Sequence, residues 1–148
     1  MEIERKFTVK KLPQNLADYP FHLIEQAYLN TDPVIRIRRQ DEEYYMTYKE
    51  KGLLAREEYN LPLNRTSYEH LKEKADGNLI AKRRYLIPCP PYTIELDIFE
   101  PPFAPLIIAE VEFPSIDEAN AFQPPAWFDR DVTQDPSYHN SSLSRKKL

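Results

Sequence analysis

The sequence predicts a mainly β fold with a few helices, in the α+β class. Stretches in which polar and apolar residues alternate, the period of β-strands, recur between residues 1 and 113. Only two stretches, 64–76 and one that opens at residue 115, change to a helical pattern. The chain has 148 residues, 41% of them hydrophobic and 30% charged, so we expect one globular domain over residues 1–148.

The first strand is expected over residues 1–10. At the strand period, one face carries polar residues and the other apolar ones: Glu2, Glu4 and Lys6 against Ile3, Phe7 and Val9. Arg5 is the one charged residue on the apolar face, and we expect it at the rim of the sheet or over the edge of a helix.

Four more strands are expected in the first half of the chain, at 21–29, 34–38, 44–49 and 54–61. Turn-forming residues separate them, and Pro62 is expected to end the last one. Short strands in this order predict a meander of about five antiparallel strands.

The spacing of apolar residues changes from the strand period to the helical period over residues 64–76. Tyr68, Leu71 and Ala75 share one helical face, with a capping box expected at 66–69 and a stop at Asp76-Gly77. Strands resume at 79–85, 92–99 and 106–113, with a break at 88–91. A short helix opens at 115–118, and we expect the remainder to be irregular or short.

Charged residues occupy the polar faces of these strands. The pattern alone favours a sheet whose charges lie in water; the alternative is a barrel whose charges line its interior. The sign of the charge favours the barrel, because acids concentrate in the first and last two strands and bases in those between, whereas solvated faces commonly mix signs. The set is Glu2, Glu4, Lys6, Arg36, Arg38, Lys49, Arg56, Glu58, Lys82, Arg84, Glu95, Asp97, Glu110 and Glu112.

Composition excludes several classes of function. The net charge of −4 argues against a general binder of nucleic acid or membrane surfaces. Cys89 is the only cysteine, so neither an internal disulfide nor a thiolate metal site is expected. No leader or membrane-spanning run is present, which predicts a cytoplasmic location. His22, His70 and His139 lack the spacing of metal ligands and are expected to be solvated or structural.

The charged set predicts a compact polyanion and a metal ion as ligands. Carboxylate oxygens suit a hard ion such as Mg²⁺ or Mn²⁺. With only two glycines there is no glycine-rich phosphate loop, so side chains must bind any phosphate. The basic residues are more than a single phosphate needs and suit a triphosphate: Lys6, Arg36, Arg38, Lys49, Arg56, Lys82 and Arg84.

An ordered series of motifs resembles the CYTH domain family, also called triphosphate tunnel metalloenzymes. The N-terminal Glu2-x-Glu4-x-Lys6 resembles its ExExK motif, and later segments resemble the family in family order. These segments include Arg36-Ile37-Arg38, Thr47-Tyr48-Lys49, Lys82-Arg83-Arg84-Tyr85, Glu95-Leu96-Asp97 and Ala109-Glu110-Val111-Glu112. Ala27, the loop 100–105 and Asn60 depart from the pattern, and Asn60 bears on the choice of substrate.

The resemblance implies a closed antiparallel eight-stranded β-barrel tunnel with a charged lumen and helices packed outside. By the same resemblance, Glu2, Glu4 and Glu112 are the expected ligands of a first metal. Glu95, Asp97 and Glu110 belong to the same acidic wall and can hold a second. The seven basic residues map onto positions that grip triphosphate, with Lys6 or Lys49 orienting the attacking water or stabilising the leaving oxygen.

Four functions are compatible with such a tunnel. The leading hypothesis is metal-dependent hydrolysis of inorganic tripolyphosphate, a small-molecule substrate, to pyrophosphate and phosphate by a monomer or homodimer. A class IV type adenylate cyclase and a thiamine triphosphatase are the enzymatic alternatives, and a polyphosphate-binding module is the non-enzymatic one. Inorganic substrate is favoured because the chain shows no extra segment for a base or a vitamin ring.

Overall fold

The computed structural model of the protein describes residues 1–148 and confirms a mainly β fold with three α-helices. The strands are β1 (Glu2–Val9), β2 (Phe21–Thr31), β3 (Val34–Gln40), β4 (Glu43–Lys49), β5 (Ala55–Arg56), β6 (Glu58–Leu63), β7 (Asp76–Cys89), β8 (Tyr92–Phe99), β9 (Ile107–Glu112) and β10 (Phe128–Asp131). The helices are α1 (Arg65–Lys72), α2 (Ile116–Ala121) and α3 (Asn140–Arg145), with 3-10 turns η1 (Leu16–Asp18) and η2 (Pro136–Tyr138). No helix is long and apolar enough to span a membrane.

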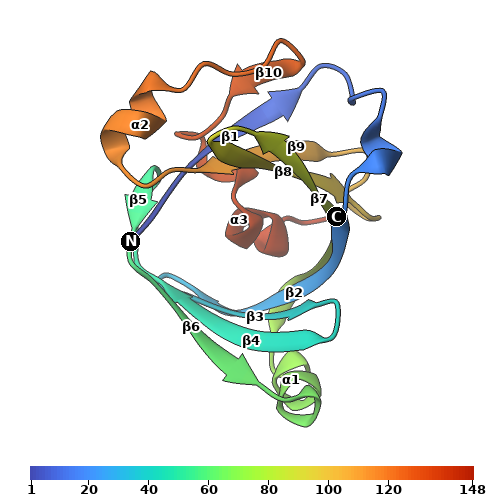
Figure 1. The fold of residues 1–148 in the computed structure, drawn as a ribbon. Helices are drawn as coiled ribbons and strands as arrows, with labels where there is room; N and C mark the ends of the chain where they lie inside the picture. The colour runs from blue at the N-terminus through green and yellow to red at the C-terminus, as the bar shows by residue number, and fades with distance from the viewer.

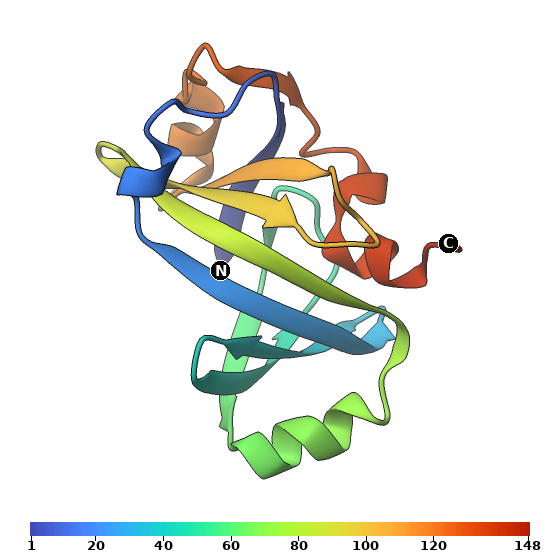
Figure 2. The same cartoon turned by 90° about the vertical axis from the view of Figure 1, so that its right-hand side faces the viewer.

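All ten strands belong to one antiparallel sheet. Nine follow the order β10-β1-β9-β8-β7-β2-β3-β4-β6. The sheet curves, so that β1, β8 and β9 lie across from β2, β3, β4 and β6 in Figure 1. The paired strands β2 and β7 run side by side across the molecule and connect the two halves (Figure 2).

The sheet is open, so the expected closed eight-stranded barrel is wrong in strand number and in closure. After Lys49 the chain leaves the ladder through a loop that contains Gly52, whose φ is +155°. It rejoins as β5, which forms two residue pairs with β1, Glu2 with Arg56 and Ile3 with Ala55. Glu57 then separates β5 from β6, so the expected strand 54–61 is divided and the ladder does not run on from β6 to β1.

Helix α1 begins earlier in the sequence than expected. Asn64 has an extended backbone, and its side chain accepts a hydrogen bond from the backbone N–H of Ser67 at 2.7 Å. The Ser67 hydroxyl accepts from the backbone N–H of Asn64 at 3.1 Å, which completes a capping box two residues before the predicted one. The helix ends at Lys72, and Asp76-Gly77 starts β7 instead of terminating the helix.

Two prolines lie inside strands where the sequence predicted strand ends. Pro62 lies in β6, opposite Tyr45, and β6 is an edge of the sheet. Pro88 lies in β7 beyond the pairing of β7 with β2, which ends at Tyr85, so only β8 flanks it. A strand with one free side tolerates a residue that has no N–H, and both strands therefore continue through their prolines.

Three apolar clusters support the sheet, each beside one helix. Phe7, Leu96 and Val111 belong to the largest cluster, which packs near α2 and includes Ala119 from that helix. Ile37 and Tyr68 lie buried between β3 and α1. Helix α3 contributes Leu143 to the third cluster, together with Tyr28, Val34, Ile80, Phe99, Phe103 and Ile108.

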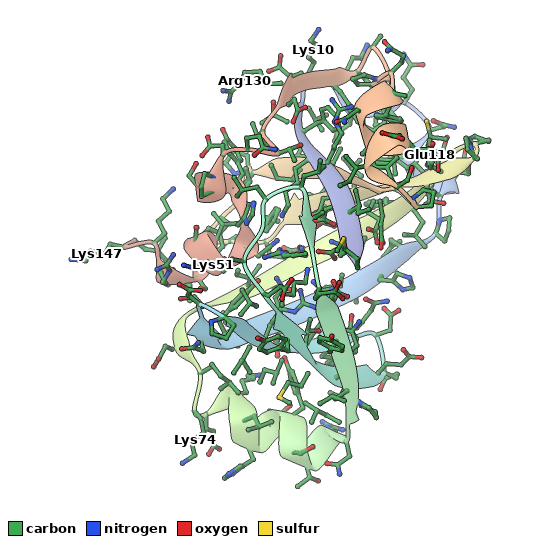
Figure 3. The ribbon with its side chains drawn as sticks, turned by 90° about the vertical axis from the view of Figure 1, so that its left-hand side faces the viewer. Lys10, Lys51, Lys74, Glu118, Arg130 and Lys147 are labelled. Atoms are coloured by element: carbon green, nitrogen blue, oxygen red, sulfur yellow. The ribbon has the colours of Figure 1, made fainter.

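Helix α3 differs from the other two. Its first residues, Asn140 and Ser141, line a cavity on the polar side of the sheet, so the prediction that all helices pack outside is wrong for α3. Figure 1 shows α3 between the two halves of the curved sheet. Charged residues on the periphery, such as Lys74 beyond α1 and Lys147 near the C-terminus, point away from the body of the protein (Figure 3).

Candidate functional site

A cavity of about 340 Å³ lies inside the curve of the sheet. Every strand except β10 contributes to its lining, and only three of its 20 lining residues are hydrophobic. Twelve of the fourteen polar-face residues predicted to share one interior line it: Glu2, Glu4, Lys6, Arg36, Arg38, Lys49, Arg56, Glu58, Arg84, Glu95, Glu110 and Glu112. Arg36 and Glu95, from opposite halves of the sheet, face the same space, as the alternation of each strand requires.

Lys82 and Asp97 do not line the cavity, which corrects their predicted position. The Lys82 ammonium lies 2.7 Å from the Asp97 carboxylate, and both side chains are completely buried. Arg84 also donates to Asp97, from Nε at 2.7 Å and from Nη2 at 2.9 Å. These contacts form a buried ion-pair network beneath the cavity. Alternation predicts which face a side chain occupies but not how deep it lies.

The acidic wall is built by the register of β1, β8 and β9. Glu4 pairs with Glu112 across β1 and β9, and Glu95 pairs with Glu110 across β8 and β9. Burial raises the pKa of Glu4 to about 7, and the charges of Glu110 and Glu2 add to that effect. Burial and neighbouring carboxylates also raise the pKa of Glu95 and of Glu112. Burial also opposes the ionisation of Glu110, but the charges of Lys6 and Arg84 outweigh it and hold the pKa of Glu110 well below its usual range. The charged forms of Glu4, Glu95 and Glu112 are stabilised by any further cation that joins them.

Cations of the cavity already contact most of these acids. Lys6 lies 3.4 Å from Glu110 and 3.7 Å from Glu4. Burial lowers the pKa of Lys6, but the two carboxylates outweigh it, so the pKa lies above its ordinary value. Lys49 lies 3.0 Å from Glu2 and 3.3 Å from Glu58, and Arg56 lies 3.6 Å from Glu2. Lys49 therefore links Glu58 to the acidic wall.

Arg36 and Arg38 differ from the other cavity cations because neither has a carboxylate partner. Arg36 donates to the Thr47 hydroxyl at 3.0 Å, and its Nε is buried without a hydrogen-bond partner. Arg38 donates to Gln26 at 2.8 Å and to the Tyr45 hydroxyl at 3.3 Å. Burial lowers the pKa of Arg38, and the charges of Arg36 and Arg84 lower it further. Two buried guanidinium groups without a counterion form a site for an anion.

The oxygen donors of the acidic wall suit a hard divalent ion, but they do not converge on one point. No three Asp, Glu, His or Cys side chains lie in the arrangement of a metal site, so the predicted set Glu2, Glu4 and Glu112 is not assembled here. The carboxylates do not converge because cations of the protein already hold them. The Glu2 carboxylate forms ion pairs with Lys49 and Arg56, and the Glu4 carboxylate forms one with Lys6. The chemistry of the donors fits the ion, provided that the carboxylates exchange these partners.

Several lining residues escaped the sequence analysis. Tyr28 and Tyr45 lie on the polar faces of predicted strands, so the alternation that identified the charges could have identified them too. Gln40 lies between the predicted strands 34–38 and 44–49, and Asn60 was noted only as a departure from the family pattern. His139 was expected to be solvated or structural, but it is 7% exposed and lines the cavity. It lies in a segment without periodic pattern, so the alternation that identified the charged residues did not place it in the cavity.

The family model described as the CYTH domain matches residues 1–123. The chain belongs to the CYTH domain family. This confirms the resemblance that the ordered charged motifs indicated. The matched part of the CYTH domain includes every strand except β10, and hence every charged residue of the cavity, whereas His139, Asn140 and Ser141 lie beyond it.

Two relatives of this CYTH domain carry the same name, inorganic triphosphatase. A protein of Nitrosomonas europaea named inorganic triphosphatase is 41% identical, over 97% of this chain and 96% of the relative. A second inorganic triphosphatase, from Acetivibrio thermocellus, is 34% identical over 96% of this chain and 92% of the relative. The crystal structure of the inorganic triphosphatase NE1496 superposes with a TM-score of 0.74 at 37% identity, covering 99% of this chain and 96% of that structure.

Proposed function

We propose that this protein is a divalent-metal-dependent triphosphatase that hydrolyses inorganic tripolyphosphate to pyrophosphate and phosphate. The observation that carries the proposal is the pair Arg36 and Arg38, buried in the cavity and free of any carboxylate partner. Their paired N–H groups match the non-bridging oxygens of a phosphate chain. The relatives named inorganic triphosphatase support the same substrate class.

The balance of charge around the cavity supports a metal–polyanion complex. Six lining residues are cationic (Lys6, Arg36, Arg38, Lys49, Arg56 and Arg84) and six are carboxylates (Glu2, Glu4, Glu58, Glu95, Glu110 and Glu112). Because these charges offset one another, the lining as a whole does not attract a bare polyanion. A triphosphate that brings Mg²⁺ or Mn²⁺ satisfies both walls, with the ion on carboxylates and the phosphates on guanidinium and ammonium groups.

The lining also favours an inorganic substrate over a nucleotide. Its three hydrophobic members are Tyr28, Val34 and Tyr45. A nucleoside or a thiazole ring needs a mainly apolar slot, and such slots dominate ordinary small-molecule sites. The cavity volume of about 340 Å³ is at the small end of such sites and suits a short phosphate chain.

Catalysis in this site is positioning and charge stabilisation. The arginines of β3 hold the phosphate chain while water attacks the terminal phosphorus and the bond to the pyrophosphate oxygen breaks. Lys6 and Lys49, each held between carboxylates, stabilise the charge that develops on the transferred group and on the leaving oxygen. Glu2, Glu4 and Glu112, with Glu95 and Glu110, are the residues that would hold metal. A bound divalent ion neutralises phosphate charge and polarises the phosphorus–oxygen bond.

We also propose how the chain is organised, where the protein acts and in which oligomeric state. Residues 1–148 act as one domain, since strands from both ends of the chain, β1 and β10, pair with each other. The open sheet curves around the cavity, and β5, which precedes β6 in the chain, pairs with β1 of the other half of the sheet. We place the protein in the cytoplasm, as a monomer or homodimer that binds neither nucleic acid nor membranes.

A substrate panel tests the proposed activity. Tripolyphosphate, ATP and thiamine triphosphate are incubated separately with Mg²⁺ or Mn²⁺, and every product is identified. We expect tripolyphosphate to give pyrophosphate and phosphate in equal amounts, much faster than ATP gives cyclic AMP. Efficient cyclisation of ATP would instead identify a cyclase, and binding of tripolyphosphate without turnover would identify a binding module.

The arginine pair provides a second prediction. Arg36→Lys or Arg38→Lys keeps the charge but loses the paired donors, so the affinity for tripolyphosphate should fall about tenfold or more. Metal binding should change little, because neither arginine contacts a carboxylate. Calorimetry with each ligand separates the two effects. The matched control is Arg39→Lys on the same strand: Arg39 is half-buried, donates to the backbone oxygen of Asp41 and does not line the cavity.

Glu112→Gln is the reciprocal variant. Glu112 lies exposed at the acidic wall, opposite Glu4, and no cation pairs with it. Its loss should weaken metal binding before it weakens tripolyphosphate binding. If Arg36→Lys and Arg38→Lys bind tripolyphosphate as the parent does, the assignment of the anion site to β3 is wrong.

A further inference from the structure

The segment after β10 brings an unused polar group to the cavity. His139 lies between η2 and α3, and its backbone is fixed on both sides. Its N–H donates to the Pro136 carbonyl at 3.0 Å, and its carbonyl accepts from the N–H groups of Ser142 and Leu143 at 3.0 and 3.1 Å. Because the main chain is held in this way, the direction in which the imidazole leaves the backbone is set by the fold.

The imidazole itself has no partner within the protein. The side chain is among the buried polar ones, and its Nε2 is buried without a hydrogen bond. Buried ring nitrogens normally find a partner, so one that lacks it in a binding cavity indicates a place for a ligand atom. The neighbouring Asn140 is already engaged: its Oδ1 accepts from the Lys82 ammonium at 3.3 Å. This contact ties the segment to the ion-pair network beneath the cavity.

The charges around His139 identify the chemistry of that ligand. Lys6 of β1, Arg56 of β5 and Lys49 of β4 face it, with Glu110 of β9 as the opposing acid. Burial lowers the pKa of His139 to about 4, and the three cations contribute to the shift. The ring is therefore neutral and carries one N–H donor. A polyanion that offsets these cations strengthens the donor and favours its protonation.

We propose that His139 is a substrate-binding residue, whose imidazole donates a hydrogen bond to an oxygen of the phosphate that also contacts Lys6 and Lys49. This inference rests on the proposed function. It adds a third wall to the site, contributed by the chain beyond β10 and lying outside the range matched by the family model. In the empty cavity the neutral imidazole supplies this donor without adding a charge to the six cationic lining residues.

Nuclear magnetic resonance of the unmodified protein tests this contact directly. The chain has three histidines, so the side-chain signals of His22, His70 and His139 can be assigned with single variants. The probe is an imido analogue of tripolyphosphate, whose bridging nitrogens resist hydrolysis, added with Mg²⁺. We expect the His139 ring signals to shift and its pKa to rise toward the ordinary histidine range, while the signals of His22 and His70 stay in place.

Kinetics provide the second readout. His139→Ala should raise the KM for tripolyphosphate about tenfold, as expected for a lost hydrogen bond to a charged group. His139→Gln keeps an N–H donor and should recover most of that loss, which a purely structural role would not explain. The matched control is His70→Ala, because His70 lies exposed on α1 and should leave KM unchanged.

The outcomes separate this inference from the proposed function. If tripolyphosphate is hydrolysed and the analogue binds by calorimetry, but the His139 signals do not move, the inference is overturned and the triphosphatase stands. Equal KM values for His139→Ala and the parent would overturn it as well. If the analogue does not bind and tripolyphosphate is not hydrolysed, the proposed function fails and the inference fails with it.

Discussion

Tripolyphosphate hydrolysis is expected to stop when EDTA removes divalent metal, and Glu4→Gln is expected to lower it at least about tenfold in excess Mg²⁺. Glu4 is buried at the centre of the acidic wall, with Glu112 opposite it and Lys6 at 3.7 Å. The amide keeps the shape of the side chain but removes the charge that holds a cation. The rate of phosphate release, measured with EDTA and at several Mg²⁺ concentrations, checks the two losses of activity. Calorimetry on Glu4→Gln checks whether its metal affinity falls. Full activity in EDTA would contradict the proposed chemistry.

The same residue predicts how metal binding depends on pH. The folded protein holds a proton on Glu4 up to pH about 7, whereas the unfolded chain releases it near its ordinary value of 4.5. A metal ion must displace this proton, so metal affinity should weaken as the pH falls below about 7. The stability of the metal-free protein depends on pH in the opposite direction. The contribution of Glu4 to the free energy of unfolding falls as the pH rises from 4.5 to about 7. Calorimetry at about pH 6 and pH 8 should show the first effect, and Glu4→Gln should reduce it.

The largest loss of stability is expected for Asp97→Ala, which should lower the free energy of unfolding by about 3–5 kcal/mol. Asp97 is completely buried and is the counterion of Lys82 and Arg84, each at 2.7 Å. Removing it leaves two buried cations, although Lys82 can lose its proton and limit the cost, since burial already lowers the pKa of Lys82. Urea unfolding at pH 7 measures the change.

Two controls accompany this prediction. Asp18→Ala removes an exposed carboxylate of η1 and should change the free energy of unfolding by less than about 0.5 kcal/mol. The double variant Lys82→Met Asp97→Asn should be less destabilised than the sum of its two single variants, because Asp97→Asn alone leaves the buried Lys82 ammonium without its carboxylate, and Lys82→Met removes that ammonium. Additive effects would show that the two groups do not act as a pair.

The sequence predicted the faces of the strands better than their ends or their depth. Alternation placed Arg36, Arg38 and Glu110 on the cavity side, because a strand turns every second side chain the same way. It did not distinguish Lys82 and Asp97, which share that face but lie beneath the cavity, because depth depends on how neighbouring strands pack.

The ends of the elements depended on neighbours that a single stretch does not reveal. Pro62 was expected to end a strand, but β6 has a free side and continues through it. The division at Glu57, which leaves the sheet open, likewise follows from a pairing with β1 that is distant in sequence. His139 could not be predicted from the sequence for the same reason: its place in the cavity comes from the docking of α3 against β2 and β7, not from a local pattern.

The pairing of β1 has a consequence for the order in which the protein assembles during synthesis. Of the ten strands β1 is made first, yet its partners are β5, β9 and β10, which end at residues 56, 112 and 131. The pairing of β1 with β9 and β10 therefore cannot form until those strands have been synthesised. Contacts between residues so distant in sequence also form slowly. The β2–β3–β4–β6 meander, whose partners are adjacent, can form beforehand. Glu2 can meet Arg56 once β5 is made, but Glu4 and Lys6 meet their β9 partners Glu112 and Glu110 only after residue 112, so a shorter nascent chain lacks part of the acidic wall.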